Sequence, residues 1–224
     1  MRLSVLENRP TMPIISHYNI EPEGELGLWQ ITEPQSYFLR RLKPKGAELE
    51  QLEQITGKSR RLEWMAVRWL LHKMSGRRKR AICLKDEHGK PHLIDSPWEI
   101  SFSHSKQLVT VIAAPMVVGI DIQSMTPSIE RIAHKFMREE ETKSLKPKTR
   151  LEHLHVYWGA KEALYKAYGR RQLDFREHIF IHPFKYNVTL GKCHGYVLKD
   201  DVEMHFNLFY KKMDQYMLVY AIEK

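Results

Sequence analysis

The segment Val117–Gln123 alternates between apolar and other side chains: positions 118, 120 and 122 are apolar, whereas 119, 121 and 123 are not. This alternation predicts a half-buried β-strand, because successive side chains of a strand point to opposite faces. Asp121 and Gln123 are therefore expected to leave the strand on the same face.

The segment Trp158–Lys166 is rich in Ala, Leu, Glu and Lys, which favour a helix. Trp158, Glu162 and Lys166 recur every four residues and so share one side of that helix. If the helix faces the strand, Asp121 and Glu162 could hold a hard cation against phosphate oxygens. Taken alone, Glu162 and Lys166 would be an ordinary helical ion pair, worth about 0.3–0.5 kcal/mol.

Together these segments resemble the signature of the 4′-phosphopantetheinyl transferase superfamily. That signature is a Gly-hydrophobic-Asp strand followed, after about forty residues, by Trp-x-x-Lys-Glu-x-x-x-Lys. Here Glu162 lies 41 positions after Asp121. The chain length resembles the longer, surfactin-synthetase-activating class. The resemblance implies an α+β fold with two similar α/β subdomains related by a pseudo-twofold axis, and a cofactor site in the cleft between them.

The 224 residues can form one large domain or two small packed ones. We expect subdomains at 1–115 and 116–224, in a monomer. No apolar run reaches the length of about 18 residues that spans a membrane, and the N-terminus has no apolar signal core. Cys83 and Cys193 are far apart in the sequence and have no metal-ligand spacing, so we expect a cytoplasmic protein.

The formal net charge of +9 indicates an acidic partner. Nucleic acid is a frequent partner of basic proteins, but the densest basic run, Arg77–Arg80, is only four residues long, and no stretch mixes aromatic and basic residues. We interpret that run as a solvated turn. Neither nucleic acid nor a membrane is expected as a partner; an acidic protein or a polyphosphate ligand suits the charge.

In the first half, Leu26–Ile31 predicts a strand and Glu48–Ile55 a helix that Gly57 ends. Ser59 is the predicted N-cap of a second helix. One apolar stripe predicts the buried face of this helix: Leu62, Met65, Ala66, Trp69 and Leu70.

Lys58, Arg60 and Arg61 lie at the start of this second helix. They form either a solvated face or a phosphate-binding group at a helix N-terminus. The family resemblance implies that basic residues here bind the nucleotide end of coenzyme A, with Arg61 the first choice and Arg60 the second.

Ala81–Leu93 predicts a β-hairpin with its turn at 86–89. Gly89, Lys90 and Pro91 match the Gly-Lys-Pro element of the family, which is associated with the adenine and phosphates of coenzyme A. The next predicted strand, Trp98–Ser105, has Ile100 and Phe102 on one face and Ser101 and Ser103 on the other. Its end resembles the hydrophobic-Ser-His-Ser element, which implies that Ser103 and His104 bind coenzyme A.

In the second half, Ser128 is the predicted N-cap of a helix that runs through Phe136 and beyond. Lys135–Arg138 form either a mixed apolar and basic surface for carrier docking or part of a half-buried helix. Alternation in 204–210 and 216–222 predicts two final strands, joined by a turn at 211–215.

The reaction implied by the resemblance moves phosphopantetheine from coenzyme A to a serine of an acidic apo carrier protein, and 3′,5′-adenosine bisphosphate leaves. Asp121, Gln123 and Glu162 are the expected ligands of Mg²⁺, with Mn²⁺ as the alternative metal. Glu162 is the first choice of general base and Lys166 the second. Lys161, Lys166 and His104 suit the leaving phosphate.

Gln123 departs from the family pattern, in which many members of the longer class carry Glu at this position. An amide oxygen can bind Mg²⁺ but adds no charge. One alternative function is therefore a catalytically weak homologue that binds coenzyme A or a carrier protein without transfer. A nucleic-acid-binding protein is a third and less favoured reading.

Overall fold

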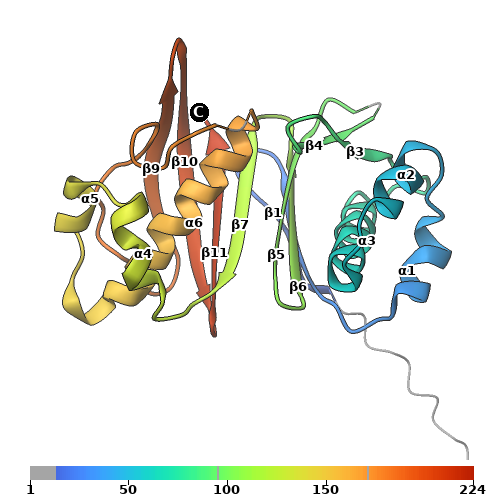
Figure 1. Ribbon diagram of the computed structural model, residues 1–224, viewed down its shortest axis with the longest axis horizontal. Coiled ribbons are helices and arrows are strands. Elements are labelled where there is room, and N and C mark those ends of the chain that lie inside the picture. The colour runs from blue at the N-terminus through green and yellow to red at the C-terminus, as the bar shows by residue number, and fades with distance from the viewer. Residues whose placement is uncertain (1–13, 95, 171) are drawn as a thin grey trace, which may run out of the picture.

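The computed structural model describes residues 14–94, 96–170 and 172–224. Two antiparallel sheets lie against each other, and each carries helices on its outer side (Figure 1). The described part of the chain is therefore a mixed α+β fold with the layer order helices, sheet, sheet, helices.

The first sheet comes from the N-terminal half and has the strand order β1-β2-β6-β5-β4-β3. Its strands are β1 (Ile14–Asn19), β2 (Glu25–Gln30), β3 (Cys83–Lys85), β4 (Pro91–Leu93), β5 (Glu99–Ser105) and β6 (Leu108–Ala114). Its helices are α1 (Gln35–Leu42), α2 (Ala47–Glu53) and α3 (Lys58–Met74).

The apolar stripe of α3 packs on this sheet as predicted. Met65, Ala66 and Leu70 are fully buried, and Leu62 and Trp69 are partly buried against the same core. Removing this stripe from water holds α3 on the sheet.

The predicted N-cap of α3 was wrong. Gly57 occupies the N-cap position, and Ser59 lies inside the first turn, where its hydroxyl donates to Glu63 Oε1 at 3.1 Å. The predicted end of the preceding helix at Gly57 was also wrong. Helix α2 ends at Glu53, and Gly57 is the N-cap of α3. Ser59 is the second residue of α3, past the position from which a side-chain oxygen accepts the first backbone N–H groups, and its hydroxyl donates one turn along instead.

The predicted hairpin is confirmed as β3 and β4. Asp86 Oδ1 accepts the backbone N–H groups of His88 and Lys90, both at 2.9 Å, and closes the turn. Gly89 has a φ of 87°, in the left-handed region that glycine adopts without strain.

The second sheet comes from the C-terminal half and has the order β7-β11-β10-β9-β8. Its strands are β7 (Val118–Ser124), β8 (Ile179–Ile181), β9 (Gly191–Lys199), β10 (Val202–Met213) and β11 (Tyr216–Glu223). The helical elements that follow β7 are α4 (Ile129–Phe136), α5 (Glu139–Lys143), η1 (Pro147–Thr149) and α6 (Arg150–Tyr168). The two final strands are confirmed, and the turn between them is the shorter pair Asp214–Gln215.

The predicted strand at 117–123 is confirmed as β7. Val118, Ile120 and Ile122 are buried in the core between the two sheets, and Asp121 and Gln123 leave on the other face, towards α6. The long helix α6 lies directly on β7 because Gly119 has no side chain. A Cβ at Gly119 would lie 1.9 Å from the carbonyl oxygen of Ala163.

The predicted helix at 128 ends earlier than expected. Met137 has an extended backbone, and Arg138 begins the separate helix α5. Ser128 occupies the predicted N-cap position of α4, but its hydroxyl contacts Thr126 Oγ1 at 2.6 Å and makes no capping hydrogen bond. Phe136 and Met137 are buried, so the apolar residues of the segment 135–138 do not lie on the surface. A role of this segment in carrier docking stays a prediction.

The chain passes from the first sheet to the second between β6 and β7. The division into domains at 115 and 116 stays a prediction, as do the pseudo-twofold axis and a cofactor site between the halves. Cys83 and Cys193 are both free and buried. Within the described ranges, none of the helices is long and apolar enough to cross a bilayer.

Candidate functional site

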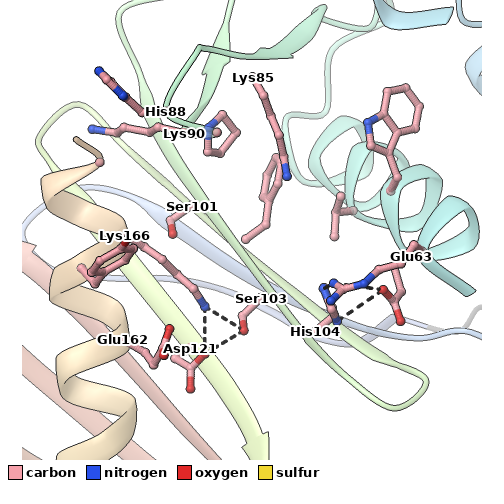
Figure 2. Close-up of a pocket in the computed structure, with 18 of the residues that line it drawn as sticks. Glu63, Lys85, His88, Lys90, Ser101, Ser103, His104, Asp121, Glu162 and Lys166 are labelled. Atoms are coloured by element: carbon pink, nitrogen blue, oxygen red, sulfur yellow. Dashed lines mark hydrogen bonds and ion pairs between the residues drawn. The ribbon is translucent and has the colours of Figure 1, made fainter. Parts of the chain in front are cut away.

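A cavity of about 720 Å³ is lined by α3, the β3–β4 hairpin, β5, β7 and α6 (Figure 2). It therefore brings together residues as far apart in the sequence as Arg60 and Lys166. Most of the predicted site residues lie on its wall: Arg60, Gly89, Lys90, Pro91, Ser103, His104, Asp121, Glu162 and Lys166.

Asp121 is held at one end of the cavity by a lysine and a serine. Lys166 Nζ lies 2.8 Å from Asp121 Oδ1 and also donates to Ser103 Oγ at 3.0 Å. The Ser103 hydroxyl donates to the same carboxylate oxygen at 3.0 Å. Asp121 is only 7% exposed, so these donors offset the loss of its hydration.

Glu162 lies beside Asp121 on α6 (Figure 2). Burial raises the pKa of Glu162, Lys166 opposes the rise, and the charge of Asp121 adds to it. Its carboxylate has no hydrogen-bond donor within the described part of the chain. Two carboxylates thus face one cavity.

Three serines of β5 join this strand to β7. Ser101, Ser103 and Ser105 accept hydrogen bonds through Oγ from backbone N–H groups of β7, at 3.2, 3.1 and 3.0 Å, respectively. The donors are those of Ile120, Ile122 and Ser124. We call this set the serine ladder. Among the described strands, β7 pairs on one edge only. The serine ladder supplies acceptors to the N–H groups of its other edge and so fixes Asp121 relative to β5.

His104 forms the opposite end of the polar wall. Arg60 Nη1 lies 2.5 Å from His104 Nε2, and His104 Nδ1 lies 3.4 Å from Glu63 Oε2. A guanidinium can only donate, so Nε2 accepts and the ring proton is on Nδ1, towards Glu63. Burial lowers the pKa of His104, Glu63 raises it, and Arg60 lowers it further.

The hairpin supplies a third part of the wall. Lys90 Nζ lies 3.0 Å from Glu99 Oε2 and donates to the carbonyl of Ala167 at 3.2 Å, near the C-terminus of α6. Lys90 thereby joins the hairpin to the C-terminus of α6, where the helix dipole favours a positive charge. Lys85 and His88 also line the cavity.

Sequence reasoning missed Glu63, Lys85 and His88. Glu63 follows Arg60 by three residues, so helical periodicity places it on the same face of α3 and could have identified it. Lys85 and His88 lie just before the Gly-Lys-Pro element, and only the three residues of that element match the family pattern.

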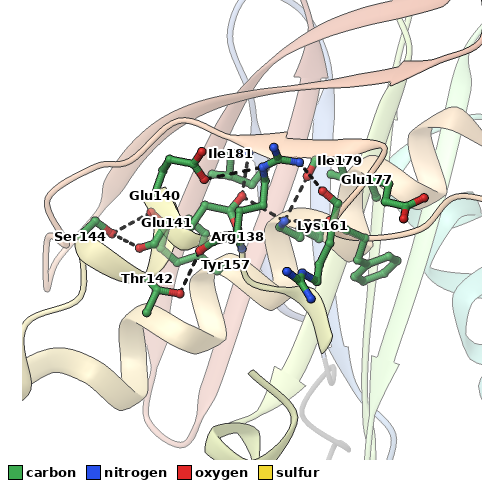
Figure 3. Close-up of polar contacts among 12 residues, drawn as sticks. Arg138, Glu140, Glu141, Thr142, Ser144, Tyr157, Lys161, Glu177, Ile179 and Ile181 are labelled. Atoms are coloured by element: carbon green, nitrogen blue, oxygen red, sulfur yellow. Dashed lines mark hydrogen bonds and ion pairs between the residues drawn. The ribbon is translucent and has the colours of Figure 1, made fainter. Parts of the chain in front are cut away.

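The structure places Lys161 away from the cavity (Figure 3). Its Nζ donates to the carbonyls of Phe175 at 2.8 Å and Ile179 at 3.0 Å and pairs with Glu141 Oε1 at 3.0 Å. Lys161 is fully buried, and burial lowers its pKa to about 8. The expectation that it contacts the leaving phosphate is corrected: Lys161 is about 100° around the helix from Glu162, on the side that packs into the protein.

The order of the two arginines of α3 is also corrected. Arg61 Nη1 donates to the carbonyls of Leu52 at 2.8 Å and Ile55 at 3.3 Å, and Arg61 does not line the cavity. Arg60 is exposed and lines it. Successive residues of a helix differ in direction by about 100°, so an uncertainty of one residue decides between a cavity residue and a structural one.

Gln123 faces α6, not the cavity. Its Oε1 lies 2.9 Å from His155 Nδ1, and its Nε2 donates to the carbonyl of His155 at 3.2 Å and to Asp121 Oδ2 at 3.3 Å. Among the described residues, no group of three or more His, Cys, Asp and Glu side chains could hold a metal ion. Any metal here would be held by Asp121, Glu162 and neutral ligands.

Residues 117–220 match a family model described as the 4′-phosphopantetheinyl transferase superfamily. The match covers somewhat less than half of the chain and includes Asp121, Glu162 and Lys166. No curated protein matches the sequence. The match supports the resemblance at the level of the superfamily and a transferase of this kind; the surfactin-synthetase-activating class stays a prediction.

Proposed function

We propose that the protein transfers 4′-phosphopantetheine from coenzyme A to a serine hydroxyl of an apo carrier protein. The observation that carries this proposal is the convergence of Asp121, Glu162 and Lys166 on one cavity, within the segment that the family model matches. The remaining walls carry cations, which suit a phosphate-rich substrate.

Coenzyme A is the substrate that we propose for the cavity. A volume of about 720 Å³ lies within the range of small-molecule sites. Arg60, Lys85 and Lys90 present cationic groups to it, and the neutral His104 adds a polar contact. Guanidinium and ammonium groups recognise phosphate oxygens through charge-assisted hydrogen bonds. The aromatic wall formed by Trp64 and Phe102 suits the apolar parts of the ligand.

The carboxylates fit a divalent cation, with Mg²⁺ proposed and Mn²⁺ as the alternative. Asp121 raises the pKa of Glu162, so a cation near both would relieve their mutual repulsion. Asp121 and Glu162 would hold the metal. When bound, it would neutralise pyrophosphate charge.

Glu162 is the proposed general base. In the transfer, the serine oxygen bonds to the phosphorus of the phosphopantetheine group, the bond from that phosphorus to the bridging oxygen breaks, and 3′,5′-adenosine bisphosphate leaves. The serine proton passes to Glu162, the carboxylate of the cavity that has no hydrogen-bond donor among the described residues. Lys166 places a positive charge beside the developing negative charge on the phosphate oxygens.

The proposed partner is an acidic carrier protein, which the net charge of +9 favours through complementary potentials. We propose a cytoplasmic monomer in which the two sheets with their helices form subdomains 1–115 and 116–224.

The test is an incubation of the purified protein with coenzyme A, Mg²⁺ and an apo acyl carrier protein, followed by the intact mass of the carrier. We expect a gain of one phosphopantetheine group, abolished by Asp121→Asn or Glu162→Gln. Glu130→Gln is the matched control, because Glu130 is an exposed carboxylate in the matched segment whose ion pair within the described residues is with Arg150. No mass gain with several apo carriers would overturn the proposal.

A second candidate is a homologue that binds coenzyme A or a carrier without transfer. Gln123 favours it, because it places an amide where many relatives carry a third carboxylate. Tight binding of coenzyme A in calorimetry, together with no mass gain on any carrier, would support this candidate.

A further inference from the structure

The contacts of Gln123 connect Asp121 to a histidine of α6 that no sequence motif singled out. His155 is 2% exposed and lies on the side of α6 that faces β7. Its ring touches Gln123 through Nδ1 and the backbone of Thr126 through Nε2. A chain of contacts thus runs from Thr126 through His155 and Gln123 to Asp121.

The directions of these hydrogen bonds follow from the Thr126 backbone. Its N–H lies 2.9 Å from His155 Nε2 and can only donate, so Nε2 is the acceptor. The ring proton is then on Nδ1 and is donated to Gln123 Oε1 at 2.9 Å. The carbonyl of Thr126, 3.2 Å from the same Nε2, is the longer contact and receives no proton in this arrangement.

The positions of the amide oxygen and the amide nitrogen of Gln123 also follow from a second, independent argument. The group near Asp121 Oδ2 and the carbonyl of His155 must be a donor, because both neighbours are acceptors at 3.3 and 3.2 Å. Exchanging the amide oxygen and nitrogen would place three acceptor oxygens together. The amide nitrogen therefore faces Asp121, and the amide oxygen is taken by His155.

We propose that Gln123 and His155 are positioning residues that orient the Asp121 carboxylate, and that Gln123 is not a metal ligand. Lys166 and Ser103 hold Oδ1, and Gln123 holds Oδ2, so both oxygens of Asp121 have a fixed donor. The consequence for catalysis rests on the proposed function; the hydrogen-bond arrangement does not.

The variant Gln123→Glu distinguishes this proposal from the metal-ligand role expected from the sequence. A ligand role predicts that Gln123→Glu leaves activity intact and lowers the Mg²⁺ concentration needed. A positioning role predicts that Gln123→Glu loses activity, because a carboxylate has no hydrogen to donate and adds a negative charge beside Asp121. Gln123→Glu should then melt at a lower temperature than the wild type in the absence of metal.

The first measurement is the side-chain ¹⁵N spectrum of histidine in the ligand-free, metal-free full-length protein. We expect His155 as the Nδ1–H tautomer, and loss of that signature in Gln123→Met, which keeps the length of the side chain but neither hydrogen bond. His153→Phe is the matched control: it removes the other buried histidine of α6, two residues earlier, and should leave the signal of His155 in place. An Nε2–H tautomer of His155 in the wild type would overturn the proposal.

The second measurement is the kinetics of transfer. Gln123→Met and His155→Phe should lower kcat by about 10- to 100-fold, the usual effect of losing an outer partner of a metal-binding carboxylate. The KM for coenzyme A should stay within about twofold, since neither side chain lines the cavity. His155→Gln, which can both accept and donate, should recover part of the loss.

Wild-type kcat in Gln123→Met would also overturn the proposal. If the wild type transfers nothing to any carrier, the proposed function fails instead, and the tautomer of His155 still decides the hydrogen-bond arrangement. Melting curves of each variant separate a local effect from unfolding.

Discussion

At the scale of single residues, neighbours in the sequence have opposite roles. Arg60 faces the cavity, whereas Arg61 holds the end of α2. His155 has a partner at both ring nitrogens, whereas neither ring nitrogen of His153 has one among the described residues. Direction around the helix, which differs by about 100° between successive residues, decides each role.

The two arginines give a paired prediction. Arg60→Ala should weaken coenzyme A binding by about tenfold, the effect of losing about 1.4 kcal/mol, and leave stability nearly unchanged because the side chain is exposed. Arg61→Ala should instead lower the free energy of unfolding by about 1–3 kcal/mol and leave binding intact, since it deprives two carbonyls of a donor. Calorimetry with coenzyme A and urea denaturation check the pair. The reverse pattern would restore the order expected from the sequence.

His153 gives a prediction about pH. Its ring stacks on Tyr157 and meets Phe184 edge to face, and burial lowers its pKa to about 4. The unfolded chain, with a pKa near 6.5, binds this proton more readily, so His153 lowers stability as the pH falls from 6.5 to 4 and has no such effect above 6.5. His153→Phe should therefore be more stable than the wild type at pH 4, by up to about 3 kcal/mol.

Denaturation curves between pH 4 and 8 measure this effect. His134→Asn, a change at an exposed histidine of α4, should keep the pH dependence of the wild type. An identical pH dependence in His153→Phe and the wild type would contradict the assignment.

At the scale of elements, α6 serves two sides of the molecule. Asp121 and the cavity lie along one side of it, and on another side Lys161 ties it to α5 and β8 through Glu141 (Figure 3). Glu141 also accepts the backbone N–H groups of Arg138 at 2.8 Å and Ile181 at 3.1 Å. One buried carboxylate thus joins α5, β8 and α6.

Breaking that ion pair should affect folding, not chemistry. Lys161→Met leaves the buried carboxylate of Glu141 without its cation and should cost about 3–5 kcal/mol of stability. Adding Glu141→Gln should recover part of that loss, because the uncompensated charge is removed. In the folded fraction, coenzyme A affinity should match the wild type. A large loss of affinity with normal stability would return Lys161 to the phosphate-binding role.

At the scale of the whole molecule, the serine ladder connects the two halves. Sheets β1–β6 and β7–β11 share an apolar core, and the ladder adds hydrogen bonds between β5 and β7 beside the cavity. Ser103 belongs both to the ladder and to the group around Asp121, so the junction of the sheets and the candidate site use the same hydroxyl.

Two steps of the ladder can be separated by mutation. Ser101→Ala and Ser103→Ala each leave a buried N–H of β7 without its acceptor and should each lower stability by about 1–3 kcal/mol. Only Ser103→Ala should also lower the rate of transfer, because only Ser103 contacts Asp121 and Lys166. Urea denaturation and the mass assay test both variants. Equal activity losses would argue for a general effect of the junction.

The sequence alone predicted the types of the main elements and most residues that line the candidate cavity. Alternation in β7 and the four-residue repeat in α6 predict which faces Asp121, Glu162 and Lys166 occupy, because the periods of strand and helix are fixed by backbone geometry. For the same reason it predicted the apolar stripe of α3 and the hairpin turn at Gly89.

Only the tertiary structure decided which polar groups meet. The positions of Arg61, Lys161 and Gln123 depend on partners that other segments supply. The caps of α3 and α4 depend on polar groups close in the sequence, because Ser59 donates to Glu63 and Ser128 contacts Thr126. A hydrogen bond needs its partner within about 3 Å and in the right direction. Sequence periodicity fixes the direction of a side chain from its own element, and packing fixes what lies opposite it.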